Sequence, residues 1–196
     1  MKSNVCKIEK GTKDLTEILG ESEKVAAYNG LNHKQTLQLR LLCEEIDGML
    51  PQILGDFEGE IWIEFEKSVC KVNVSIVFED FTADKKKELI SISKNKKNVA
   101  AKGITGKVRS VVEDLLLDEY AQQSLAMPLN VYYLPVEHMD YTYLWSLGQY
   151  KDEVKKEEKA EQWDALEKSV IAGVADDVIV GVKGKKADII VVKDFA

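Results

Sequence analysis

The stretch that decides the fold is Gly30–Asp80, which reads GLNHKQTLQLRLLCEEIDGMLPQILGDFEGEIWIEFEKSVCKVNVSIVFED. Its first half places Leu, Ile and Met at helical spacing after Asn32, a residue type that caps helices, and closes at Gly55. Its second half alternates acidic and apolar residues over Glu60–Glu66 and, after a two-residue turn, continues as the apolar run Val69–Phe78. The stretch therefore predicts a buried amphipathic helix followed by an antiparallel hairpin.

The remaining segments are read from the same signals. An edge strand is expected in Met1–Glu9, helices in Thr12–Tyr28, Ala83–Ser93, Val108–Leu117 and Lys151–Glu161, and a strand or an extended apolar segment in Leu125–Leu134. The aromatic and charged segment at about 124–161 has two readings, extra cover for the core or a surface for a partner.

Composition excludes several classes of function. The 196 residues are 45% hydrophobic, enough for the core of one ordinary domain. A net charge of -7 and a sequence pI near 5.1 argue against nucleic acid or an anionic membrane as the main partner. The three cysteines show no metal-binding or disulfide spacing, and with no signal peptide they indicate a reducing cytoplasm. Two histidines without clustered thiols give a zinc site little support.

One basic segment has the pattern of an anion site. Gly103, Gly106 and Lys107 come just before an apolar helix, whose N-terminus would present free amide donors. The segment is not a P-loop, because Ala101 and Val108 stand where that motif needs a glycine and a hydroxyl.

The order of these elements resembles the GHKL (histidine-kinase-like) ATPase superfamily, most closely its branch of anti-sigma-factor and serine kinases. The resemblance rests on the acidic helix around Glu44-Glu45, the strand Val74–Asp80, and the passage from Ala175 through the last hairpin. It implies an α/β sandwich in which a mixed, mostly antiparallel sheet carries helices on one face, and a single domain over residues 1–196.

The resemblance also implies roles for particular residues. Glu44 stands where the family has its general base, Asp80 where it has the adenine contact, and Gly103, Gly106 and Lys107 where it has the phosphate loop. The family's magnesium-binding Asn is replaced by Gly48 when counted from Glu44, and Asp47 is the candidate for a displaced carboxylate ligand. ATP or ADP is thus the expected ligand, while Mg²⁺ lacks its usual amide.

The same acids also have structural readings. Arg40 is placed to pair with Glu44 across one helical turn, and Asp80 is placed to cap the helix expected at Ala83–Ser93. Two functions follow, one if these acids have the roles that the resemblance implies and one if their roles are only structural. The first is an adenine-nucleotide-binding regulatory protein, with catalysis weak or lost and a regulatory protein as its partner. The second is a protein-interaction module on the same scaffold that no longer binds nucleotide.

Overall fold

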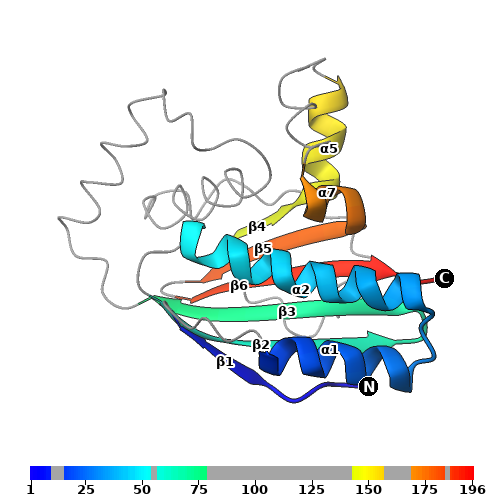
Figure 1. Cartoon of the computed structure of the whole chain (residues 1–196). Coiled ribbons are helices and arrows are strands. Elements are labelled where there is room, and N and C mark those ends of the chain that lie inside the picture. Colours follow the sequence, from blue (N-terminus) through cyan, green and yellow to red (C-terminus); the bar gives the residue numbers. More distant parts are fainter. Residues whose placement is uncertain (10–15, 54–56, 79–142, 157–168, 184–185) are drawn as a thin grey trace.

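The computed structural model describes residues 1–9, 16–53, 57–78, 143–156, 169–183 and 186–196. In these residues six strands form one antiparallel sheet with the order β1-β2-β3-β6-β5-β4 (Figure 1). The strands are β1 (Cys6–Glu9), β2 (Phe57–Glu66), β3 (Val69–Phe78), β4 (Tyr143–Ser146), β5 (Asp177–Lys183) and β6 (Lys186–Asp194). The helices are α1 (Thr16–Tyr28), α2 (His33–Ile53), α5 (Leu147–Lys156) and α7 (Val170–Val174).

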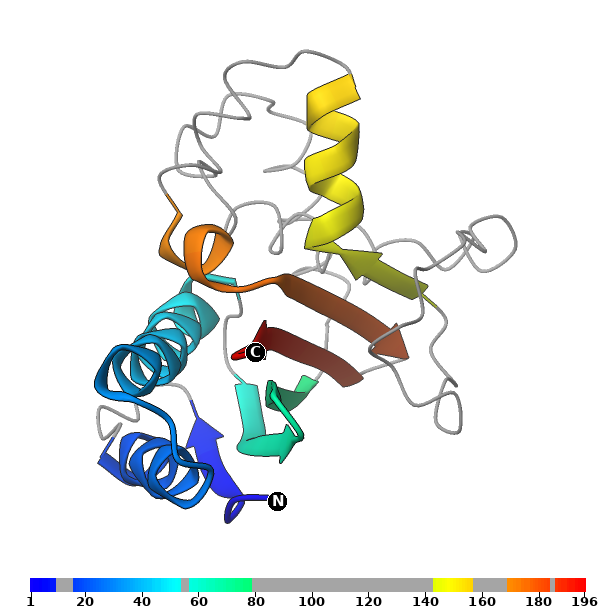
Figure 2. The ribbon, with the colours of Figure 1, turned by 90° about the vertical axis from the view of Figure 1, so that its right-hand side faces the viewer.

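The two long helices lie side by side over one face of the sheet, and α7 packs beside α2 on the side away from α1 (Figures 1 and 2). This arrangement confirms the predicted α/β sandwich with helices on one face. The sheet was expected to be mixed and mostly antiparallel, and all of its described strands pair antiparallel.

The predicted helix and hairpin of Gly30–Asp80 are present as α2, β2 and β3. Gly30 has a φ of 68° and the amide of Leu31 donates to the carbonyl of Ala26 at 3.0 Å, so α1 ends in a glycine C-cap. The next helix, α2, begins three residues after Gly30, at His33. Asn32 Oδ1 accepts from the Gln35 amide at 3.0 Å and Gln35 Oε1 accepts from the Asn32 amide at 2.9 Å, a reciprocal cap that fixes the start of α2.

The hairpin of β2 and β3 turns at Lys67, whose φ is 58°. Its register is constrained further along by Gly59, which pairs with Ile76 and faces the helix layer. A Cβ at Gly59 would lie 2.5 Å from the backbone oxygen of Ser75, a separation that side chains essentially never adopt. Gly59 therefore allows the two strands to approach closely at this point.

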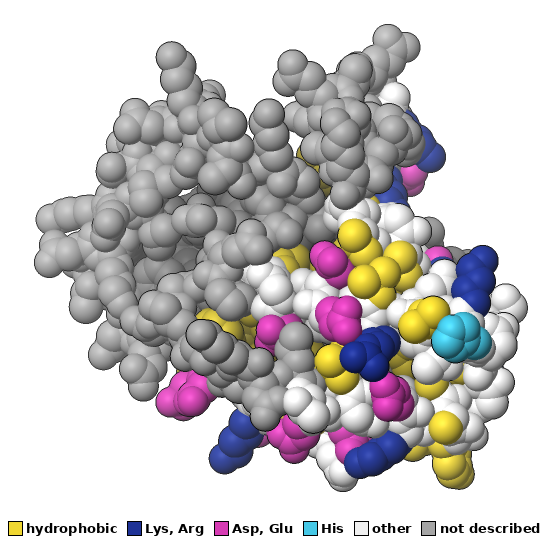
Figure 3. All heavy atoms as spheres, in the orientation of Figure 1, with side chains coloured by type: hydrophobic (Ala, Val, Ile, Leu, Met, Phe, Trp, Pro, Cys, Tyr) yellow, Lys and Arg dark blue, Asp and Glu magenta, His cyan; other side chains and the backbone are white. Residues whose placement is uncertain are grey.

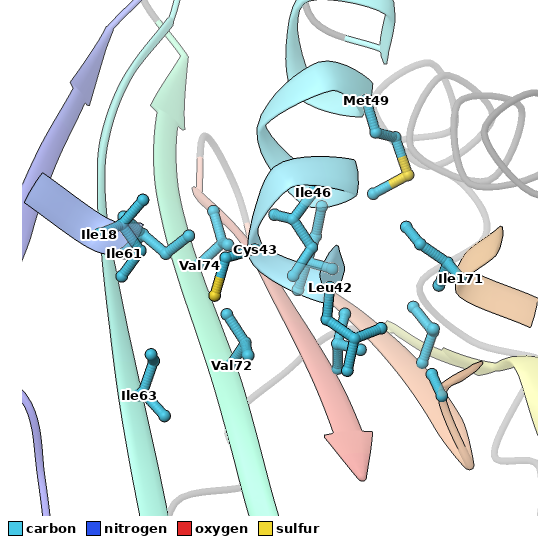
Figure 4. Close-up of a cluster of buried hydrophobic side chains, with 14 of the residues drawn as sticks. Ile18, Leu42, Cys43, Ile46, Met49, Ile61, Ile63, Val72, Val74 and Ile171 are labelled. Atoms are coloured by element: carbon cyan, nitrogen blue, oxygen red, sulfur yellow. The ribbon is translucent and has the colours of Figure 1, made fainter. Parts of the chain in front are cut away.

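The core lies between α2 and the sheet (Figure 4). Leu42, Cys43 and Ile46 have no exposed surface and point from α2 onto the strands. They meet side chains from α1, β2, β3 and α7: Ile18, Ile61, Ile63, Val72, Val74 and Ile171. The helical spacing of the apolar residues thus determines which face of α2 is buried.

Strands β5 and β6 are buried on both faces. Val178 and Val180 face the helices, so the alternation of a strand turns Ile179 to the opposite face, where it is only 4% exposed. The same holds for Val192, which neighbours the core residue Val191 and has no exposed surface. Burial on both sides explains why these strands are nearly continuous apolar runs.

A buried acid connects α1 to the N-terminal segment. Glu21 accepts from Lys24 Nζ at 2.7 Å and from the backbone amide and side-chain nitrogen of Asn4 at 3.0 and 3.1 Å. These hydrogen bonds, that from Lys24 first, hold the pKa of the Glu21 carboxyl below its ordinary value of 4.5. The carboxylate is therefore stabilised in its charged form although it is buried.

Several expected elements shift or lie outside the described residues. The edge strand begins only at Cys6, and α5 begins at Leu147 instead of Lys151. Leu147 has no exposed surface and belongs to the core, so part of the 124–161 segment does cover the sheet. The segments 83–93, 108–117 and 125–134 lie outside the described residues.

Candidate functional site

The predicted base, Glu44, lies on α2 in an ion pair. Arg40 Nε donates to Glu44 Oε1 at 3.1 Å, as the four-residue spacing predicts, and Arg40 Nη1 donates to Glu23 Oε1 of α1 at 2.8 Å. The Glu44 side chain is 40% exposed. Arg40 thereby joins the two helices and holds Glu44 on the α1 side of α2.

Asp47 and Gly48, the candidate metal ligand and the residue in the family's Asn position, follow one turn later. Asp47 is half-buried, and burial raises the pKa of its carboxyl above the ordinary 3.8. Gly48 is exposed, and a Cβ added there would meet no atom within 4 Å. Gly48 has no side-chain oxygen for Mg²⁺, and Asp47 is the nearest carboxylate to its position in the sequence.

The opposite flank of α2 faces α7. Met49 is 2% exposed and extends toward Ile171 of α7 (Figure 4). Glu45 lies four residues before Met49 and therefore on the same flank, where it is half-buried. Counting the family's spacing from Glu45 thus leads to a core methionine and not to a metal ligand.

The elements that would carry the site meet at one end of the sheet (Figure 1). The last residue of β3, Phe78, pairs with Phe57, which follows the end of α2 after three residues. At the same end Val77 pairs with Lys186 beside the turn between β5 and β6. The C-terminal half of α2, the end of β3 and this turn are therefore close together, and Asp80 lies two residues beyond β3 in the sequence.

The other predicted site residues cannot be placed in this geometry. Asp80, Gly103, Gly106 and Lys107 lie outside the described residues, so their roles stay predictions. Within the described ranges, no three His, Cys, Asp or Glu side chains gather closely enough to hold a metal ion.

The helix surface beside this region is mixed in charge. Acidic and basic side chains are interspersed over α1 and α2, with apolar side chains among them (Figure 3). Leu37 and Tyr28 are the large apolar residues most exposed on these helices, at 50% and 78%. This face has the character of a solvated helix layer.

The three cysteines are part of the core. Cys6, Cys43 and Cys70 are free thiols and buried, as was expected of Cys43. Burial raises the pKa of Cys6 to about 11 and that of Cys70 to about 12, and it raises the pKa of Cys43 as well. Thiols with such pKa values are protonated at neutral pH and are poor nucleophiles and poor metal ligands.

A second group of charges, which sequence reasoning missed, joins β5 to α5 and α7. Asp177 Oδ1 accepts from the amide of Gly148 at 3.0 Å and from that of Val178 at 2.8 Å, and Lys151 Nζ donates to the carbonyl of Ala172 at 2.9 Å. Burial raises the pKa of Asp177 and lowers the pKa of Lys151. An acidic pair just before an apolar strand was the available signal, but nothing in the sequence pairs it with α5.

Comparison of the chain with protein-family models, with curated proteins and with solved structures finds no match. In the parts of the chain that the structure describes, no helix has both the length and the apolar character needed to cross a membrane.

Proposed function

We propose that this chain is a regulatory protein that binds ATP or ADP at the end of the sheet where β3 terminates, with little or no phosphoryl transfer. The observation that carries the proposal is the meeting of three elements at that end: the C-terminal half of α2, the last residue of β3 and the turn between β5 and β6. Asp80 follows β3 by two residues, which suits a contact to an adenine amino group.

Weak or absent turnover follows from the residues on α2. Arg40 engages Glu44 and directs it toward α1, and the position one turn later is Gly48. Mg²⁺ requires oxygen ligands in near-octahedral geometry, and at these positions only Asp47 is left to supply one. Nucleotide binding is therefore expected to be nearly independent of Mg²⁺. The proposal places the protein in the cytoplasm, where nucleotide is abundant and the buried thiols stay reduced.

A thermal-shift titration with ATP and with ADP, each with and without Mg²⁺, tests the proposal. A nucleotide at about 100 times its dissociation constant adds about 2.7 kcal/mol of stability, a readily measured shift. Asp80→Asn should remove the shift, whereas Asp152→Asn, the same change at an exposed residue of α5, should keep it. The absence of any shift at millimolar nucleotide would refute nucleotide binding.

The second candidate function is a protein-interaction module without nucleotide. The Arg40–Glu44 pair and the glycine at position 48 favour it, because both remove family chemistry while leaving the scaffold intact. Under this function a protein that co-purifies with the chain would bind equally well with and without ATP. A nucleotide-dependent change in that affinity would instead favour the first function.

A further inference from the structure

The helix α5 is attached to the rest of the molecule differently from α1 and α2. It rises from the β4 edge of the sheet, away from the layer of α1 and α2 (Figure 2). The strand before it, β4, has four residues and pairs only with β5 among the described strands. Of the described α5 side chains, Leu147 is fully buried and Tyr150 packs partly against the core.

Polar contacts concentrate on the first turn of α5. Ser146, the residue just before α5, caps the helix: its Oγ accepts from the Gln149 amide at 3.2 Å. Asp177 of β5 accepts from the Gly148 amide at 3.0 Å, so a carboxylate from another strand also occupies the positive end of the helix. The attachment of α5 to β5 thus depends on a charged residue.

Lys151 provides a second attachment, to α7. Its ammonium donates to the carbonyl of Ala172, in the last turn of that five-residue helix, at 2.9 Å. Lys151 and Asp177 also attract each other electrostatically; Asp176 adds a smaller attraction, and Lys155 and Lys193 repel the Lys151 ammonium. One positive and one negative group, both half-buried, therefore connect α5 to two different elements.

We propose that Asp177 and Lys151 form a charge latch that holds β4 and α5 against β5 and α7. When the latch is lost, β4 and α5 open together while the layer of α1 and α2 stays folded. The latch needs no nucleotide and is independent of the proposed function. Ile171, next to Ala172, packs toward Met49 of α2, so α7 lies between the latch and the helix layer.

Partial burial makes the latch sensitive to the loss of either Asp177 or Lys151. It disfavours the charged form of both groups, raising the pKa of Asp177 and lowering that of Lys151, and each group is hydrogen-bonded to the backbone of another element. Asp177 accepts from the Gly148 amide and Lys151 donates to the Ala172 carbonyl, so loss of either residue removes one of the two attachments of α5. Each loss should therefore weaken the attachment by about the contribution of one helix cap.

Hydrogen–deuterium exchange of the full chain tests the latch. Asp177→Asn removes the charge and Lys151→Met removes the donor while keeping an alkyl stem. Each is expected to speed exchange in peptides covering 147–156 by about tenfold, the factor that loss of one cap produces, with little change in peptides covering 33–50. Asp152→Asn and Lys155→Met make the same chemical changes at exposed residues of α5, and neither should speed exchange; removal of Lys155 takes away a charge that repels Lys151.

Two outcomes would overturn the proposal. Unchanged exchange in 147–156 for Lys151→Met would show that the latch does not hold α5. Equal acceleration in 147–156 and 33–50 would show that the molecule opens as one body. If Asp177→Asn does not fold, Lys151→Met with its Lys155→Met control still decides between these outcomes.

Discussion

Substitution of Gly59 by alanine tests the close approach of β2 and β3. The new Cβ would lie 2.5 Å from the backbone oxygen of Ser75 and 3.3 Å from two atoms of Ile76. The Ser75 oxygen belongs to β3, which is held on its far side by the ladder to β6, so it cannot rotate away as a side chain would. Strand β2 must therefore move by several tenths of an ångström, and the pairing beside Gly59 must weaken.

The size of the effect follows from two opposing terms. Overpacking a well-packed site destabilises by about 1–3 kcal/mol. Alanine also restricts the unfolded chain more than glycine does, which offsets about 0.4–1 kcal/mol. The net expectation for Gly59→Ala is a loss of about 1–2 kcal/mol in the free energy of unfolding.

Urea denaturation followed by circular dichroism measures this loss, with Gly20→Ala as the matched control. Gly20 lies inside α1 with no atom within 4 Å of an added Cβ, so the same substitution there should stabilise by about 0.5–1 kcal/mol. The reasoning predicts opposite signs for the two variants. A Gly59→Ala protein as stable as wild type would show that the strands do not approach closely at this point.

Three further predictions concern the caps, the buried acid and the magnesium position. Asn32→Ala should lower stability by about 1 kcal/mol in urea denaturation, because it removes one half of the reciprocal cap with Gln35. Glu21→Gln should be about 1–2 kcal/mol less stable than wild type at pH 7, because it loses charge-assisted hydrogen bonds. The pKa of Glu21 is depressed, so its stabilisation is present above the ordinary value of 4.5 and is lost as pH falls through the depressed value; the thermal unfolding curves of the two proteins should converge in acid. Gly48→Asn should make nucleotide binding depend on Mg²⁺ in the thermal-shift assay, because it adds an amide oxygen at an uncrowded position on α2; a Mg²⁺ response identical to wild type would count against a metal site there.

What could be predicted from the sequence was local. The Asn32 cap, the apolar spacing of α2 and the turn at Lys67 all act within a few residues, so the sequence pattern alone locates them. The Arg40–Glu44 pair was predictable for the same reason, but its extension to Glu23 was not, because that contact depends on how α1 packs against α2. Contacts of this kind are determined by tertiary structure.

The Asp177–Lys151 group shows why contacts between residues far apart in the sequence were not predicted. The two residues are 26 positions apart, and neither lies in a periodic pattern that would pair them. Their relation arises only when β5 pairs with β4 and brings the first turn of α5 over the start of β5. Gly59 is similar, because only the register of β2 against β3 reveals its close contact.

On α2, the residues that support the core and the candidate site residues are different and differ in burial. Leu42 and Ile46 have no exposed surface and support the sheet, whereas Glu44 and Gly48, each two residues further along, are half-buried and exposed on the same helix. The residues that form the core are therefore not those of the candidate site, and substitution of Glu44 or Gly48 can leave the sandwich intact. Leu42→Ala should cost about 2–5 kcal/mol and reduce any nucleotide response together with folding. Glu44→Gln should leave both nearly unchanged if turnover is already absent, and a loss of ATP hydrolysis in that variant alone would show that Glu44 still acts as a base.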